Sequence, residues 1–118
     1  MTITLPLPPN MANSRMHWRV KNRKRKEYFG ACDILLAPYM VYFPDDPPPH
    51  VRLTATVYCG GRMDQDNAIA RLKWPVDWMV TNGILKNDDP CHLEWAWPIG
   101  QVVKRKQRYR VEFELETA

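Results

Sequence analysis

The sequence has few cysteines, and this scarcity narrows the class of protein. The three cysteines are widely spaced and form no Cys-X-X-Cys pair. An odd number at such spacing predicts reduced thiols rather than a disulfide framework or a zinc site. Cys91 and His92 are adjacent, but two ligands do not complete the tetrahedral shell of a structural zinc ion.

The sequence also lacks the segments that direct a protein to a membrane. No apolar run in the chain approaches the ~20 residues that span a bilayer. The opening residues, MTITLPLPPN, contain no basic region followed by a long apolar core. We therefore expect no signal peptide, a cytoplasmic location and no membrane partner.

The composition fits one globular domain covering residues 1–118. Hydrophobic residues make up 45% and charged residues 25% of the chain, which are ordinary proportions for a globular protein. A chain of 118 residues is long enough for one core but not for two. There is no internal repeat, and the only biased tract is the proline-rich stretch at 43–50.

Positive charge is concentrated in two short segments. The net charge is +4, and twelve of the seventeen Lys and Arg residues lie in 15–26 or 104–110, where Trp18 and Tyr109 are interleaved. A solvated face or a charged hairpin would explain either cluster alone. Two clusters around an acidic centre favour a nucleic-acid surface. The predicted DNA-binding residues are Arg15, Arg19, Lys21, Arg23, Lys24, Arg25, Lys26, Arg71, Lys104, Arg105 and Lys106.

Hydrophobic periodicity predicts an α+β domain. Alternating residues predict strands over 2–7, 51–58, 93–97 and 108–116, and stripes of helical period predict helices from about 24 to near 38 and over 67–82. The order β-α-β-α-β-β predicts one mixed sheet of about four strands with two helices packed on it. Pro75 predicts a kink or break in the second helix.

The stretch from Arg62 to Asp89 contains five of the thirteen Asp and Glu residues. Asp64 and Asp66 are two residues apart, so on an extended chain both side chains point to the same side. Asp88 and Asp89 follow the predicted helix, and we expect them to return to the same end of the sheet. Three carboxylates from two loops would then bind magnesium. The alternative is structural, because such pairs also cap helices and form turns.

Several motifs of the chain resemble the RusA-like Holliday junction resolvases. They are DQDN at 64–67, the step from Lys73 to Asp77, NGIL at 82–85, the pair at 88–89, and the opening ITLPLPPN at 3–10 followed by a basic segment. The resemblance covers most of the chain in order. It implies a small homodimeric endonuclease, often encoded by phages or prophages, that nicks four-way DNA junctions symmetrically with magnesium or manganese.

The resemblance also implies roles for individual residues. Asp64, Asp66 and Asp89 match the metal-binding and catalytic aspartates of the family, and Asp88 precedes the last of these. The family has an essential lysine four residues after the second aspartate, where this chain has Ala70. Lys73 keeps the family spacing to Asp77, which a three-residue insertion would explain, and Arg71 is the other candidate.

The sequence therefore predicts a magnesium-dependent crossover junction endodeoxyribonuclease with catalytic residues Asp64, Asp66, Asp89 and Lys73. The predicted metal ligands are Asp64, Asp66, Asp89 and Asp88, with manganese as a substitute ion. The partners are branched DNA and a second copy of the chain, and no small-molecule cofactor is expected. The alternatives are a DNA-junction binder without catalysis and a basic structural domain whose aspartates only cap a helix.

Overall fold

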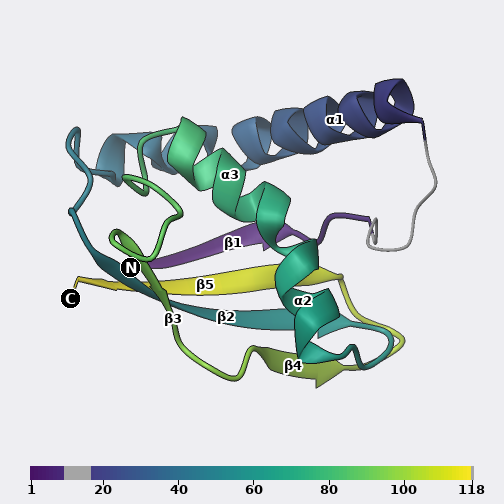
Figure 1. The fold of residues 1–118 in the computed structure, drawn as a ribbon. Coiled ribbons are helices and arrows are strands. Elements are labelled where there is room, and N and C mark those ends of the chain that lie inside the picture. Colours follow the sequence, from purple (N-terminus) through teal and green to yellow (C-terminus); the bar gives the residue numbers. More distant parts are fainter. Residues whose placement is uncertain (10–16, 118) are drawn as a thin grey trace.

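Five strands of the protein form one mixed sheet, and the helices cover one of its faces (Figure 1). The computed structural model describes residues 1–9 and 17–117. Its elements are β1 (Thr2–Pro6), α1 (Trp18–Leu36), the 3-10 helix η1 (Ala37–Tyr42), β2 (Val51–Cys59), α2 (Gln65–Arg71), α3 (Lys73–Thr81), β3 (Leu93–Trp95), β4 (Gly100–Val103) and β5 (Arg110–Thr117). The radius of gyration of 14.1 Å is close to the ~13.5 Å of one domain of this length. The α+β class is confirmed.

Strand β2 lies at the centre of the sheet and follows the alternation seen in the sequence. Val51, Leu53, Ala55 and Val57 are buried, and the residues between them are exposed or half-buried. β5 runs antiparallel between β1 and β2 and buries Val111 and Phe113 against the same core. The sheet order is β1-β5-β2-β3, so β1 forms one edge.

The other edge of β2 is shared by two short strands, one more than the sequence predicted. β3 pairs with the start of β2 and β4 pairs with its end, and both run parallel to β2. The predicted strand over 93–97 ends at Trp95, although Ala96 still donates its backbone N–H to the carbonyl of Leu53 at 2.9 Å. The chain then returns to the edge of the sheet as β4, a strand that the sequence pattern does not predict.

Helix α1 begins at Trp18, earlier than the predicted start near Lys24. The imidazole Nδ1 of His17 accepts the backbone N–H of Arg19 at 3.2 Å and caps the helix. The predicted apolar stripe is only partly buried: Tyr28, Cys32 and Leu36 are buried, whereas Leu35 and Tyr39 are exposed. In residues 1–9 and 17–117, no helix is long and apolar enough to cross a membrane.

The second predicted helix is divided at Leu72, which has φ −88° and ψ 3°. The expected break is therefore present, but it lies three residues before Pro75. Pro75 falls in the first turn of α3, where a helix needs no backbone N–H from proline. α3 packs on α1 through Trp78, which is 1% exposed and donates its indole N–H to Asp33 Oδ1 at 2.8 Å.

Candidate metal and nucleic-acid site

Asp64 and Asp66 lie where the chain leaves β2 and enters α2. Asp64 is the residue before the helix, in extended conformation, and its side chain makes no capping hydrogen bond. Asp66 lies in the first turn of α2, and both side chains are exposed. Negative charge is favoured at this end of a helix by the backbone dipole. Among the described residues neither carboxylate has a hydrogen-bond or ion-pair partner, so both are available to a ligand.

Two glutamine side chains fix this acidic segment to the edge of the sheet. Gln65 donates to the carbonyl of Ile99 at 3.1 Å and accepts the backbone N–H of Ile99 at 2.8 Å. Gln101 makes the equivalent pair of bonds with the backbone of Met63, both at 2.8 Å. These four bonds hold the start of α2 against β4. Nothing in the sequence spacing of the two glutamines predicts this contact.

Asp88 and Asp89 lie in the turn that precedes β3. Asp89 accepts hydrogen bonds from the backbone N–H of His92 at 3.1 Å, and its Oδ1 lies 2.6 Å from His92 Nδ1. The bond to the His92 side chain, followed by its charge, lowers the pKa of Asp89. Asp88 is exposed, and its backbone N–H donates to Asn87 Oδ1 at 2.8 Å.

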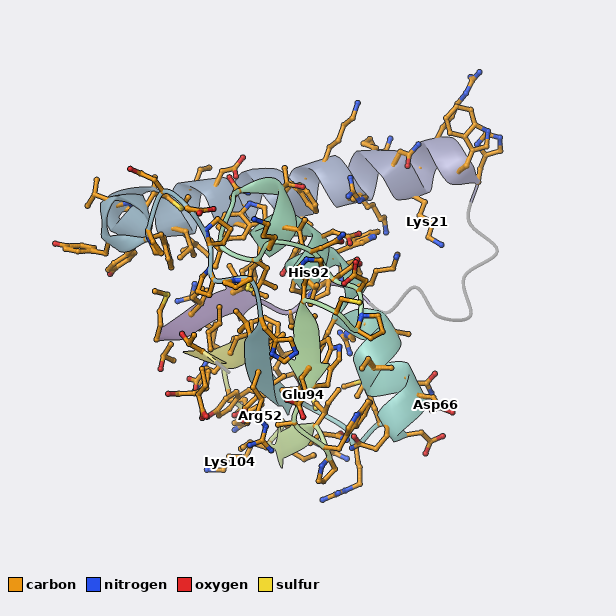
Figure 2. The ribbon with its side chains drawn as sticks, turned by 60° about the vertical axis from the view of Figure 1, so that its left-hand side comes forward. Lys21, Arg52, Asp66, His92, Glu94 and Lys104 are labelled. Atoms are coloured by element: carbon orange, nitrogen blue, oxygen red, sulfur yellow. The ribbon has the colours of Figure 1, made fainter. Side chains whose placement is uncertain are left out.

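The two acidic segments lie at different heights along β2, contrary to the expectation that both follow the same end of the sheet. β3 runs parallel to β2. The chain must therefore return from the end of β2 to its start before β3 begins, and Asp88 and Asp89 lie at that start. Leu93 pairs with Val51, whereas Ile99, which contacts Gln65, precedes the pairing of Gly100 with Thr56. The five residue steps from Val51 to Thr56 correspond to roughly 17 Å along β2. Figure 2 shows Asp66 on α2 well apart from His92.

A three-carboxylate metal centre is accordingly absent from the described part of a single chain. Residues 1–9 and 17–117 contain no group of three or more His, Cys, Asp or Glu side chains that could hold a metal ion. Asp64 and Asp66 share one segment at the start of α2, whereas Asp89 of the same chain lies in the separate turn before β3.

A small pocket rich in positive charge lies one helical turn beyond Asp66. It has a volume of about 200 Å³, and its lining contains three cations and no acid: Pro8, Pro9, Lys21, Ala70, Arg71, Lys73 and Trp74. Ala70 follows Asp66 by four residues and therefore lies on the same face of α2. The pocket brings Lys21 of α1 together with Arg71 and Lys73. These two residues are the candidates for the essential lysine that the resemblance implies.

Arg71 and Lys73 differ in how they are held. Arg71 donates its Nε–H to the carbonyl of Pro8 at 2.8 Å, and burial lowers its pKa. Lys73 is exposed, and no hydrogen bond or ion pair among the described residues occupies its amine. Arg71 therefore supports the pocket wall, and Lys73 is the cation with a free head group.

The second basic segment lies at the end of β2 from which the acidic segment departs. Lys104, Arg105 and Lys106 are exposed in the turn between β4 and β5. The turn is fixed to the end of β2, because Cys59 O accepts the backbone N–H of Lys104 and the side-chain amide of Gln107, both at 3.0 Å. These cations are therefore fixed beside Cys59 at the end of β2, but Figure 2 shows Lys104 well apart from Asp66. The pocket, in contrast, lies one helical turn beyond Asp66.

The first basic segment forms the start of α1. Arg19 stacks on the ring of Trp18, which is 62% exposed. Arg23 pairs with Glu27 and Arg25 with Asp77, so these two are partly neutralised. Lys21 and Lys26 are exposed and Lys24 is half-buried, while Arg15 lies outside the described residues. The described part of this predicted surface therefore offers Arg19, Lys21, Lys24 and Lys26.

Comparison with known proteins adds no family assignment. The chain matches no family model, and no curated protein matches it significantly.

Proposed function

We propose that the protein is a magnesium-dependent endonuclease that resolves four-way DNA junctions, a homodimeric member of the RusA-like Holliday junction resolvases. The observation that supports this proposal is the arrangement at the start of α2. Two exposed carboxylates, Asp64 and Asp66, lie at the start of α2, and the pocket with Lys21 and Lys73 lies one helical turn further along the same helix. A DNA strand with one phosphate held at this pocket would place a neighbouring phosphodiester at the carboxylates.

The carboxylates of Asp64 and Asp66 suit a hard divalent cation such as magnesium or manganese. Both offer exposed oxygens without a competing partner among the described residues, and such ions bind a few carboxylates while keeping several waters. When bound, the ion would lower the pKa of a water molecule and neutralise charge on the phosphate. Lys73 would stabilise the negative charge that develops on the phosphate oxygens.

The third carboxylate comes, in this proposal, from the second subunit. In its own chain Asp89 closes the turn before Leu93, which pairs with Val51, whereas Gln65 contacts Ile99 beside Gly100, which pairs with Thr56 roughly 17 Å further along β2. A four-way junction has two-fold symmetry, and a two-fold dimer supplies two equivalent sites. If the two-fold axis passes beside the β3–β4 edge, Asp64 and Asp66 of each subunit approach Asp89 of the partner subunit.

Cleavage of a synthetic four-way junction tests the activity. We expect paired symmetric nicks that require magnesium or manganese, no nicks with Asp66→Asn, and unchanged junction binding by that variant in calcium. Junction binding without nicks in either metal would instead support the non-catalytic binder. Equal affinity for junction and linear duplex would leave only the basic structural domain.

A mixture of two inactive variants tests the contribution of both subunits. Asp66→Asn and Asp89→Asn are each expected to abolish cleavage. A heterodimer of the two variants has one site with both substitutions and one site with neither if Asp89 acts across the dimer, so nicking of one strand returns. If every site is built within one chain, both sites of the heterodimer stay damaged and no nicking returns.

A further inference from the structure

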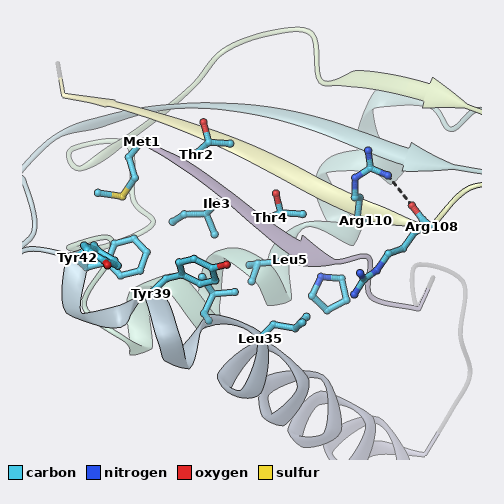
Figure 3. A pocket seen from close by; sticks show the side chains of 13 residues that line it. Met1, Thr2, Ile3, Thr4, Leu5, Leu35, Tyr39, Tyr42, Arg108 and Arg110 are labelled. Atoms are coloured by element: carbon cyan, nitrogen blue, oxygen red, sulfur yellow. Dashed lines mark hydrogen bonds between the residues drawn. The ribbon is translucent and has the colours of Figure 1, made fainter.

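A groove of about 490 Å³ lies between the free edge of β1 and the end of α1 with η1 (Figure 3). One side is β1 itself, from Met1 to Pro6, and the other side is formed by Leu35, Tyr39, Tyr42 and Phe43. It lies on the edge of the sheet opposite β3 and β4. The candidate metal site therefore does not use it.

The backbone of β1 has unpaired hydrogen-bonding groups along this groove. Met1 and Leu115 exchange backbone hydrogen bonds, at 2.8 Å and 3.3 Å. In an antiparallel pair such bonded positions alternate with non-bonded ones, so Ile3 and Leu5 also bond to β5. Thr2 and Thr4 then direct their N–H and C=O groups away from β5, and within the described residues β1 pairs with no other strand.

The wall of the groove is unusually apolar for a surface. Tyr39 is 57% exposed, Tyr42 77% and Leu35 39%, and the neighbouring Ile34 and Val41 are also exposed. An exposed apolar patch beside unpaired strand groups is the arrangement to which an extended peptide adds as a further strand. Every second side chain of such a peptide would pack against Leu35, Tyr39 and Tyr42.

The groove carries positive charge at the end where β1 finishes. Arg110 pairs with Pro6 in the sheet register, and Arg108 and Arg110 both line the groove. Figure 3 shows the Arg108 side chain directed toward this end. Arg110 is in an ion pair with Glu112, whereas Arg108 is in none among the described residues. The lining contains no Asp or Glu, so an acidic group on the occupant would meet Arg108.

We propose that this groove binds an extended segment of a partner protein, with alternating apolar residues and an acidic residue at the end beside Arg108. The segment adds to β1 as a sixth strand through the N–H and C=O groups of Thr2 and Thr4. A second copy of this chain fits less well. Docked groove to groove, it would bring two further arginines and no carboxylate from the lining.

Synthetic peptides test the proposal without DNA or metal, so the result is independent of the proposed nuclease activity. The probe is a capped, fluorescent hexapeptide that alternates valine and threonine and carries glutamate at one end, made in both orientations. We expect one orientation to bind, and its affinity to fall about tenfold when lysine replaces glutamate. Arg108→Ala should remove this preference for glutamate. Binding of both peptides equally, or of neither, would overturn the proposal.

Two variants of one residue separate strand addition from other contacts. Thr4→Pro removes an edge-directed N–H without breaking a bond to β5, and proline is tolerated on edge strands. It should weaken peptide binding about tenfold, whereas Thr4→Val keeps the N–H and should bind as the parent does. Slower amide exchange at Thr2 and Thr4, but not at Ile3, should accompany binding. Concentration-dependent dimerisation that Thr4→Pro abolishes would show that the occupant is a second copy and would overturn the proposal.

Discussion

The carboxylate of Asp89 is joined to His92 through two contacts, at 2.6 Å to the ring Nδ1 and at 3.1 Å to the backbone N–H. The backbone carbonyl of Asp89 also accepts the N–H groups of His92 and Leu93, at 3.0 Å and 2.9 Å. Asp89 therefore closes the turn from which β3 starts. The same residue is a predicted metal ligand, so its structural and catalytic contributions must be measured separately.

The pH dependence of stability should report the structural contribution of Asp89. Its folded-state pKa is held below the ordinary value of 3.8, first by the hydrogen bond from His92. A lowered pKa contributes stability above pH ~3.8, and that contribution is lost as the pH falls through the folded-state pKa. His92→Phe should lower the melting temperature at pH 7, and its difference from the parent should shrink below pH ~4. A constant difference from pH 7 to pH 3 would contradict this assignment.

The three thiols should differ in reactivity in the folded protein. Cys91 is exposed, whereas Cys32 and Cys59 are buried, and burial raises the pKa of Cys32 to about 11. At pH 8 we expect one thiol to react rapidly with an aromatic disulfide reagent and Cys91→Ser to remove that phase. Cys59→Ser, as the control, should leave it unchanged. Two or more fast thiols in the native state would contradict the burial of Cys32 or Cys59.

The raised pKa of Cys32 also predicts a loss of stability in alkaline solution. The ordinary thiol pKa is 9.0 and that of folded Cys32 is about 11, so the folded state keeps a proton that the unfolded state loses. The free energy of unfolding should therefore fall between about pH 9 and pH 11, and Cys32→Ala should remove that part of the slope. Urea titrations of both proteins at pH 8 and pH 10.5 measure it.

The indole of Trp78 should be the main polar link between α1 and α3. Its N–H is buried and donates to Asp33 Oδ1 at 2.8 Å. Asp33→Ala leaves this donor without a partner and should lower the free energy of unfolding by about 1–3 kcal/mol. Asp33→Asn keeps an acceptor oxygen and should lower it much less. Equal losses for the two variants in urea denaturation would show that the hydrogen bond contributes little.

The sequence predicted the parts of the fold that local periodicity determines. Alternation identified β2 and β5, and proline identified a division of the second helix. The sequence pattern could not predict the direction of β3, because side chains alternate in the same way on parallel and antiparallel strands. That one direction decides whether the turn with Asp89 lies at the end of β2, from which the segment of Asp64 departs, or at its start. The bonds from Gln65 and Gln101 depend on β4, a strand of four residues that carries no distinctive pattern.

Substitutions in the cationic pocket should separate the two candidates for the family lysine. Lys73 is exposed, so Lys73→Ala should change the free energy of unfolding by no more than ~0.5 kcal/mol. If its amine stabilises the phosphate in the transition state, the same variant should lower kcat for junction cleavage by about 100-fold. Lys86→Ala, an exposed lysine outside the pocket, is the matched control and should cleave as the parent does.

Arg71→Ala should show the opposite pattern, because Arg71 holds the carbonyl of Pro8. Loss of this hydrogen bond should lower the free energy of unfolding by about 1–3 kcal/mol, with a smaller effect on kcat once the variant is measured well below its melting temperature. Arg71→Lys should not fully restore stability, since a lysine cannot reproduce the guanidinium geometry. If Arg71→Ala abolishes cleavage at unchanged stability while Lys73→Ala cleaves normally, the two roles are exchanged, and the guanidinium is the group that faces the phosphate.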